Sequence, residues 1–154
     1  MSNAALALAP EPHVIVHSDL LGPLSVDPSQ LISFPTGIYG FPECRTFVLL
    51  KAQLEGTFWL QSVEYGTLAF LLVDPFRFFD GYHVDLSPAD LARLGSSDPT
   101  SIAVLAITTL PRERSEPCTA NLQGPLLIDM QGRRGQQAVF ADGPYGTREP
   151  LTLK

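Results

Sequence analysis

The chain has 154 residues, a formal net charge of −6 at pH 7 and a sequence pI of about 4.9, and 45% of its residues are hydrophobic. This composition excludes a disordered chain, and the length allows one domain with a buried core. The first 110 residues hold four basic and eleven acidic side chains, which argues against direct nucleic-acid binding because phosphate neutralisation requires clustered Lys and Arg. This acidic balance suits a basic partner protein, although solubility alone is the simpler explanation of the charge.

The N-terminus, the apolar stretches and the cysteines indicate the compartment. Residues 1–12 are rich in Ala and Pro and predict a flexible leader, and they lack the positive charge that begins a signal peptide. The longest other apolar stretch, residues 102–110, is too short to span a bilayer. Cys44 and Cys118 form no closely spaced pair, so two free thiols are expected. The sequence therefore predicts a cytoplasmic protein without a membrane span, in which residues 13–154 form a single domain.

Short apolar runs separated by Pro and Gly predict many short strands. The expected strands, in chain order, are residues 14–16, 24–27, 31–34, 46–51, 58–62, 68–73, 81–85, 101–109, 118–122, 126–130 and 136–140. Residues 145–153 are expected to form a tail. The chain contains 14 Pro and 12 Gly. Because helix interiors tolerate neither Pro nor Gly well, these counts also favour a β-rich fold.

The segment from Phe58 to Phe79 is predicted to form the centre of the fold. It contains Trp59, the only tryptophan, and five of the nine phenylalanines. Residues 68–73 are apolar at every position, which is typical of a strand in the middle of a sheet with both faces covered.

Residues 87–95 predict the clearest helix. Ser87 suits the N-cap, Pro88 the first helical position, and Asp90 the third position of a capping box. Gly95 is a typical residue at the C-terminal end of a helix. With one or two short helices and about ten short strands, the sequence predicts a mostly β, small single-domain antiparallel β-barrel-like fold.

The loop expected at residues 37–42 carries three large apolar side chains, Ile38, Tyr39 and Phe41. Such a loop either folds back onto the core or is available to a partner.

The sequence offers little support for a catalytic or metal site, and no cofactor is expected. His13 and His17 flank a strand, where their side chains share one face but lie roughly 13 Å apart, too far for one ion. There is no nucleophile elbow, dinucleotide fingerprint or P-loop sequence. Asp74 precedes Pro75 at the end of a strand, where its side chain is expected to form an Asx turn.

A series of short phrases follows one order along the chain. They are Phe34–Phe41 (FPTGIYGF), Trp59–Ser62 (WLQS), Leu68–Phe70 with Asp74-Pro75, Thr119–Leu122 with Gly124–Leu126, Gly135–Phe140 and Arg148–Leu151. Each phrase is weak alone, but in this order, over about residues 14–151, they resemble the bacterial flagellar assembly factor FliW family. The family usually has Pro at the position of Tyr39 and Ala at the position of Gly124, and both differences fall in expected loops.

The resemblance implies a non-enzymatic, monomeric β-barrel-like protein that binds two protein partners. One partner is flagellin. The other is the carbon storage regulator CsrA, a small basic RNA-binding dimer that represses flagellin translation. The implied function is that flagellin export frees the protein to bind CsrA and relieve this repression.

Two groups of residues are candidates for partner binding. Ile38, Tyr39 and Phe41 suit the apolar face of an amphipathic helix of flagellin. The hypothesised CsrA-facing surface combines acidic side chains with Phe76 of the aromatic run at residues 76–79. Ordinary solvated carboxylates are the alternative explanation for the acidic residues, which are Glu43, Asp74, Asp80 and Asp85.

Two other functions remain open. The first is a flagellin chaperone without CsrA activity. The second is a small ligand-binding or enzymatic barrel that uses Asp74, Tyr82 and His83, which requires a pocket joining these three side chains.

Overall fold

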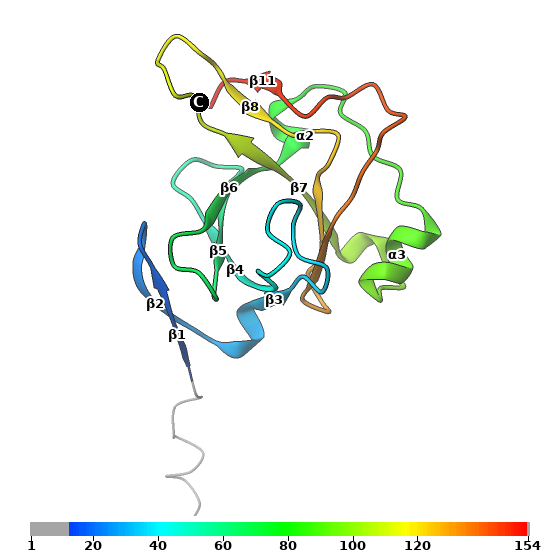
Figure 1. The fold of residues 1–154 in the computed structure, drawn as a ribbon. Coiled ribbons are helices and arrows are strands. Elements are labelled where there is room, and N and C mark those ends of the chain that lie inside the picture. Colours follow the sequence, from blue (N-terminus) through cyan, green and yellow to red (C-terminus); the bar gives the residue numbers. More distant parts are fainter. Residues whose placement is uncertain (1–12, 154) are drawn as a thin grey trace, which may run out of the picture.

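The computed structural model describes residues 13–153, so the predicted leader, residues 1–12, lies outside the described residues. Within this range the chain forms eleven strands, two short α-helices and two 3-10 helices (Figure 1). The strands are β1 (Val14–Ser18), β2 (Gly22–Val26), β3 (Leu31–Ser33), β4 (Thr46–Lys51), β5 (Thr57–Ser62), β6 (Ala69–Val73), β7 (Ile102–Thr109), β8 (Cys118–Ala120), β9 (Leu126–Asp129), β10 (Arg134–Gln137) and β11 (Glu149–Leu151). The helices are η1 (Pro28–Gln30), α2 (Pro75–Phe78), α3 (Pro88–Leu94) and η2 (Pro99–Ser101).

Seven of the strands close into a barrel. They follow the order β7-β6-β5-β4-β3-β10-β9, and the pairing of β7 with β9 completes the ring. Closure leaves no free sheet edge within the ring. The pairings are antiparallel except for β10 with β3, where Arg134 lies opposite Ser33 in a parallel arrangement. The predicted mostly β barrel is therefore confirmed, with a mixed ring.

Strand β7 connects the barrel to an outer extension of the sheet. In its first half Leu105 lies opposite Leu126 of β9, and in its second half Thr108 lies opposite Ala120 of β8. Strands β8 and β9 therefore follow one another along β7, separated by the loop of residues 121–125. Strand β11 then pairs with β8 outside the ring (Figure 1).

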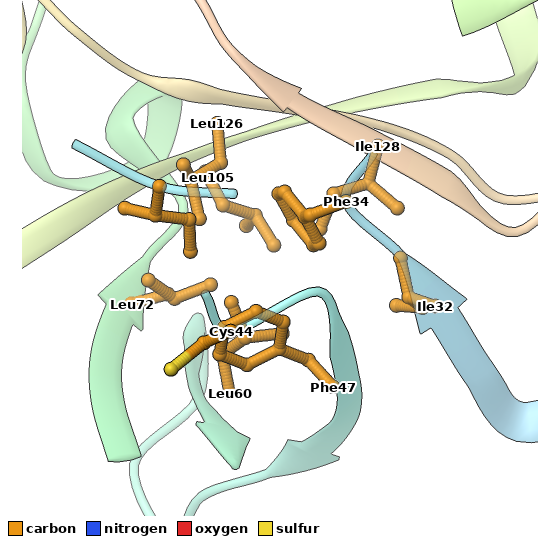
Figure 2. Packing of buried hydrophobic residues seen from close by; sticks show 10 residues of the cluster. Ile32, Phe34, Cys44, Phe47, Leu60, Leu72, Leu105, Leu126 and Ile128 are labelled. Carbon is orange, nitrogen blue, oxygen red and sulfur yellow. The ribbon is translucent and has the colours of Figure 1, made fainter. Parts of the chain in front are cut away.

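The barrel interior is filled by apolar side chains from most of its strands and from the loop between β3 and β4 (Figure 2). Phe34 of this loop is fully buried and meets Phe47 of β4 edge to face, with ring centroids 5.2 Å apart. Gly135 of β10 lies against the same ring, because a Cβ at this position would be 2.4 Å from a Phe34 ring atom. The close packing of Gly135 and Phe34 fixes one end of the β3–β4 loop in the core.

The β1–β2 hairpin covers part of the outer surface of the ring. Val16 and Val26 pack with Val48 of β4. At Gly66, in the β5–β6 loop, a Cβ would lie 2.5 Å from the carbonyl oxygen of His17, so glycine allows the hairpin to approach this loop closely.

The central hairpin and the capped helix match their predictions. Strands β5 and β6 are neighbours within the ring, and β6 also pairs with β7. Helix α3 has Ser87 as its N-cap, a capping box with Asp90, and Gly95 in the left-handed conformation at φ 67°. Both thiols, Cys44 and Cys118, are free.

The predictions for two segments were wrong. Residues 81–85 do not form a strand; they cross the outside of the barrel, where the amide of His83 donates to the Tyr145 hydroxyl at 3.2 Å. The predicted tail contains β11, the outermost strand of the sheet. Pro150 suits this position because it lacks an N–H for a further strand. Strand β10 also begins earlier than predicted, directly after Arg133, whose φ of 55° turns the chain.

None of the helices in the described range has the length and hydrophobicity needed to cross a membrane.

Candidate protein-binding face

The β3–β4 loop, residues 34–45, divides its apolar side chains between the core and the solvent. Ile38 is only 2% exposed and packs in the barrel interior, whereas Tyr39 is 70% exposed and Phe41 is 38% exposed. The turn depends on Gly37, which has φ 68° and leaves room for only a hydrogen beside the backbone of Pro42. The prediction that Ile38 contacts a partner is therefore corrected: burial removes it from the accessible surface.

Phe41 connects this surface to the core. Its ring lies edge to face on Phe70 of β6 at 5.4 Å, and Phe70 in turn lies 6.2 Å from Phe47. The exposed part of Phe41 is therefore held in place by aromatic packing, which gives a partner a rigid apolar contact.

A shallow hollow of about 490 Å³, here called the loop hollow, lies between the β3–β4 loop and β10. The amide of Tyr39 donates to the Gln137 side-chain oxygen at 2.9 Å, and the Gln137 amide group donates to the Gly124 carbonyl at 2.9 Å. Gln137 therefore ties the loop, β10 and the β8–β9 connection together. The lining residues are Thr36, Gly37, Ile38, Tyr39, Gly40, Pro42, Gln136 and Gln137.

A second hollow of about 460 Å³, here called the Tyr145 hollow, lies between the irregular residues 83–85 and the segment after β10. Its lining is mostly apolar, with Val139 54% exposed at its edge. Two carboxylates, Asp85 and Asp142, also line it, and no Lys or Arg does. The lining residues are His83, Val84, Asp85, Val139, Phe140, Ala141, Asp142, Gly143, Pro144 and Tyr145.

A cluster of three aromatic rings packs next to the Tyr145 hollow. The rings of Tyr82 and Tyr145 lie 4.7 Å apart, and the half-exposed ring of Phe76 lies 5.5 Å from Tyr82. The Tyr82 hydroxyl donates to the buried Leu122 carbonyl at 2.9 Å. Burial, with a smaller contribution from the neighbouring Tyr145, raises the pKa of Tyr82 to about 12. Tyr82 thus stays a neutral hydrogen-bond donor that holds residues 81–85 against the barrel.

The two hollows share one stretch of chain. Gln136 and Gln137 line the loop hollow, and Val139 to Tyr145 line the Tyr145 hollow. In an extended chain, residues two positions apart lie about 7 Å apart on the same side. Residues 36–42 of the β3–β4 loop, residues 136–145 and residues 83–85 line the two hollows in succession, and the surface that they provide is here called the two-hollow face.

The predicted acidic residues do not all lie on this face. Asp85 lines the Tyr145 hollow and pairs with His83 at 2.8 Å, with both side chains largely exposed. Asp74 is half-buried at the N-cap of α2, where it accepts from the Phe76 amide at 3.0 Å, so the predicted Asx role is confirmed. Glu43 and Asp80 are exposed, and no contact joins either of them to the hollows. Partner contact by Glu43, Asp74, Phe76 and Asp80 stays a prediction.

The alternative of a catalytic site built from Asp74, Tyr82 and His83 is not supported. Asp74 caps α2, the Tyr82 hydroxyl is bound to a backbone carbonyl, and His83 pairs with Asp85. The Tyr145 hollow, which His83 lines, has neither Asp74 nor Tyr82 in its lining. Among residues 13–153 there is also no group of three or more His, Cys, Asp or Glu side chains placed to hold a metal ion.

The sequence did not indicate the end of β10 and the segment after it, residues 136–145, as candidate site residues. Gln137, Val139, Phe140 and Tyr145 provide much of the two-hollow face. The available signal was the phrase Gly135–Phe140, which combines two glutamines with an apolar run at the end of a short strand.

Comparisons with known proteins identify the family. The family model described as "FliW protein" matches residues 15–151. The flagellar assembly factor FliW of Natranaerobius thermophilus is 35% identical over 137 residues, covering 88% of this chain and 91% of the relative. The FliW of Moorella thermoacetica is 38% identical, covering 88% and 87%. A crystal structure of the flagellar assembly factor FliW superposes with a TM-score of 0.82 at 30% identity, covering 92% of this chain and 99% of that one. The chain belongs to the FliW family of flagellar assembly factors.

Proposed function

We propose that this protein binds flagellin and, when free of flagellin, binds and antagonises the translational repressor CsrA, thereby relieving repression of flagellin translation. It acts in the cytoplasm as a monomer. Family membership supports a role in flagellar assembly. The net charge of −6 supports a basic protein partner, because opposite charges accelerate association and favour the correct orientation.

The observation that carries the proposal is the pair of adjoining hollows on the two-hollow face. The loop hollow has uncharged lining residues and lies beside two exposed aromatic side chains, Tyr39 and Phe41. This chemistry suits the apolar face of an amphipathic helix, which we assign to flagellin. The Tyr145 hollow carries two carboxylates, which suits the basic CsrA. Gln136 and Gln137 line the loop hollow and residues 139–145 line the Tyr145 hollow, so the two linings are close neighbours in the chain, and we expect a partner at one hollow to obstruct the other.

Replacing Tyr39 with alanine is expected to weaken flagellin binding by about tenfold or more, since exposed aromatic anchors often dominate an interface. Tyr39 is 70% exposed, so its side chain contributes little to folding. Titration calorimetry of the full chain with monomeric flagellin measures the effect. Tyr65→Ala is the matched control, because Tyr65 is 49% exposed but lies in the β5–β6 loop, outside the lining of both hollows. Equal losses for both variants contradict the assignment of flagellin to the loop hollow.

The same titration separates the proposal from the chaperone alternative. A protein that binds flagellin but shows no binding to CsrA, tested under the same conditions, acts as a flagellin chaperone alone. Binding to both partners supports the regulatory function.

A further inference from the structure

We propose that the Tyr145 hollow is the docking site for a basic segment of a partner protein, in which an apolar side chain enters the hollow and a neighbouring Lys or Arg meets its acidic rim. Taking CsrA as the source of this segment rests on the proposed function. The choice of an apolar side chain beside a Lys or Arg rests only on the lining of the hollow.

The walls of the hollow suit an apolar side chain. Val84, Val139, Phe140 and Pro144 line it together with the ring of Tyr145. Val139 keeps 54% of its surface exposed, so a docked side chain has apolar surface to cover. Covering this apolar surface removes it from water, which favours docking.

The rim suits a cation. Asp85 and Asp142 are both exposed at the hollow, and its lining contains neither Lys nor Arg. His83 also lines the hollow, and its Nε2 lies 2.8 Å from Asp85, so Asp142 is the carboxylate chosen for the test. The hollow beside the β7–β8 loop differs, because Arg112 and Arg148 line it together with Glu116. Charge complementarity therefore favours a basic segment at the Tyr145 hollow and not at the hollow beside the β7–β8 loop.

The hollow is already ordered for binding. The Tyr145 hydroxyl donates to the Gly81 carbonyl at 3.3 Å and accepts from the His83 amide at 3.2 Å. Its ring packs on Tyr82, whose hydroxyl is fixed to Leu122. Binding therefore orders few protein groups, which lowers the entropic cost of association.

Charge reversal at the rim tests the site with CsrA. Asp142→Lys is expected to weaken CsrA binding at least about tenfold, with a smaller dependence of affinity on salt than the unmodified protein shows. Val139→Ser, which leaves the charge of the rim unchanged but removes the apolar contact, is expected to weaken binding to a similar extent. Glu113→Lys is the matched control, because it makes the same charge change on an exposed residue of the β7–β8 loop and is expected to reduce affinity less than about threefold. Equal effects of the two charge reversals overturn the proposed site for CsrA.

A peptide probe tests the hollow independently of CsrA. The acetylated and amidated tetrapeptide Lys-Leu-Arg-Lys is titrated into the isotopically labelled full chain, with Glu-Leu-Glu-Glu as the control peptide. Saturable shifts of the Val84, Val139 and Gly143 amide resonances with the basic peptide alone support the docking site. If those shifts appear but CsrA does not bind, the docking site stands and the proposed partner is wrong. If neither the peptide nor the Asp142→Lys variant implicates the hollow, the docking site is wrong.

Discussion

Replacing Gln61 with glutamate is expected to lower the free energy of unfolding by about 3–5 kcal/mol at neutral pH, which is the range for an uncompensated buried charge. Gln61 is fully buried, and its side-chain amide group faces four backbone carbonyls in and beside the β5–β6 loop. The distances are 3.0 Å to Ser62, 3.1 Å to Leu68, 3.3 Å to Gly66 and 3.5 Å to Tyr65. A carboxylate in this place has no donor to bind and is repelled by these oxygens.

The pH dependence of this variant provides a second readout. Burial among carbonyls raises the pKa of the new carboxyl group in the folded state above its value in the unfolded state. The unfolded state therefore loses the proton first as pH rises, and the destabilisation grows from acidic to neutral pH. Chemical denaturation of the unmodified protein and of Gln61→Glu at about pH 4.5 and pH 7.5 measures how the difference in their free energies of unfolding changes with pH. A stability difference that stays constant with pH contradicts the buried position of Gln61.

Gln61→Leu is the control for loss of hydrogen bonds without charge. The carbonyls lose one donor group, which costs about 1–3 kcal/mol, but no charge is buried. The Gln61 side-chain oxygen has no hydrogen-bond partner in the described structure, so leucine also removes one unsatisfied buried group. We therefore expect Gln61→Leu to be less destabilising than Gln61→Glu.

Replacing Gly135 with alanine is expected to destabilise the fold by about 2 kcal/mol, within the range for overpacked cores. The new Cβ would lie 2.4–2.7 Å from three atoms of the Phe34 ring. That ring is fully buried against Phe47 and has no exposed space into which it can move. The clash exceeds the gain of about 0.4–1 kcal/mol that Gly→Ala brings by restricting the unfolded chain.

A smaller side chain at position 34 should relieve this clash. Phe34→Leu alone leaves a cavity and is expected to destabilise the barrel. The double variant with Gly135→Ala should lose less stability than the sum of the losses of the two single variants. Denaturant unfolding of both single variants and the double variant measures the coupling energy. Gly143→Ala is the control, because its Cβ would come no closer than 3.3 Å to the Phe140 carbonyl oxygen and 3.9 Å to the Phe140 Cβ. Additive losses for Phe34→Leu and Gly135→Ala contradict the packing of these residues against each other.

The parts of the fold that depend on local signals could be predicted from the sequence. The apolar run of β6 and the capping residues Ser87, Asp90 and Gly95 act through neighbouring residues, and both elements formed as expected. Residues 81–85 could not be predicted in the same way. Their alternating pattern resembles a strand, but their position is set by contacts such as that of His83 with Tyr145, 62 residues away.

The candidate site was only partly predictable, because it too depends on contacts between segments that lie far apart in the sequence. The sequence indicated that the β3–β4 loop carries apolar groups, but it could not separate the buried Ile38 from the exposed Tyr39. That division depends on the turn at Gly37, where φ is 68°. The Tyr145 hollow joins residues 83–85 to residues 139–145, and no periodicity in either segment indicates that they meet.

The central claim is that flagellin and CsrA use one face and exclude each other through residues 136–145. Size-exclusion chromatography with light scattering tests it most directly, with flagellin titrated into a preformed complex of the full chain and CsrA. We expect CsrA to leave the complex as flagellin binds, so that the complex with flagellin and free CsrA elute separately. A ternary complex of the protein, flagellin and CsrA at saturating flagellin would contradict it.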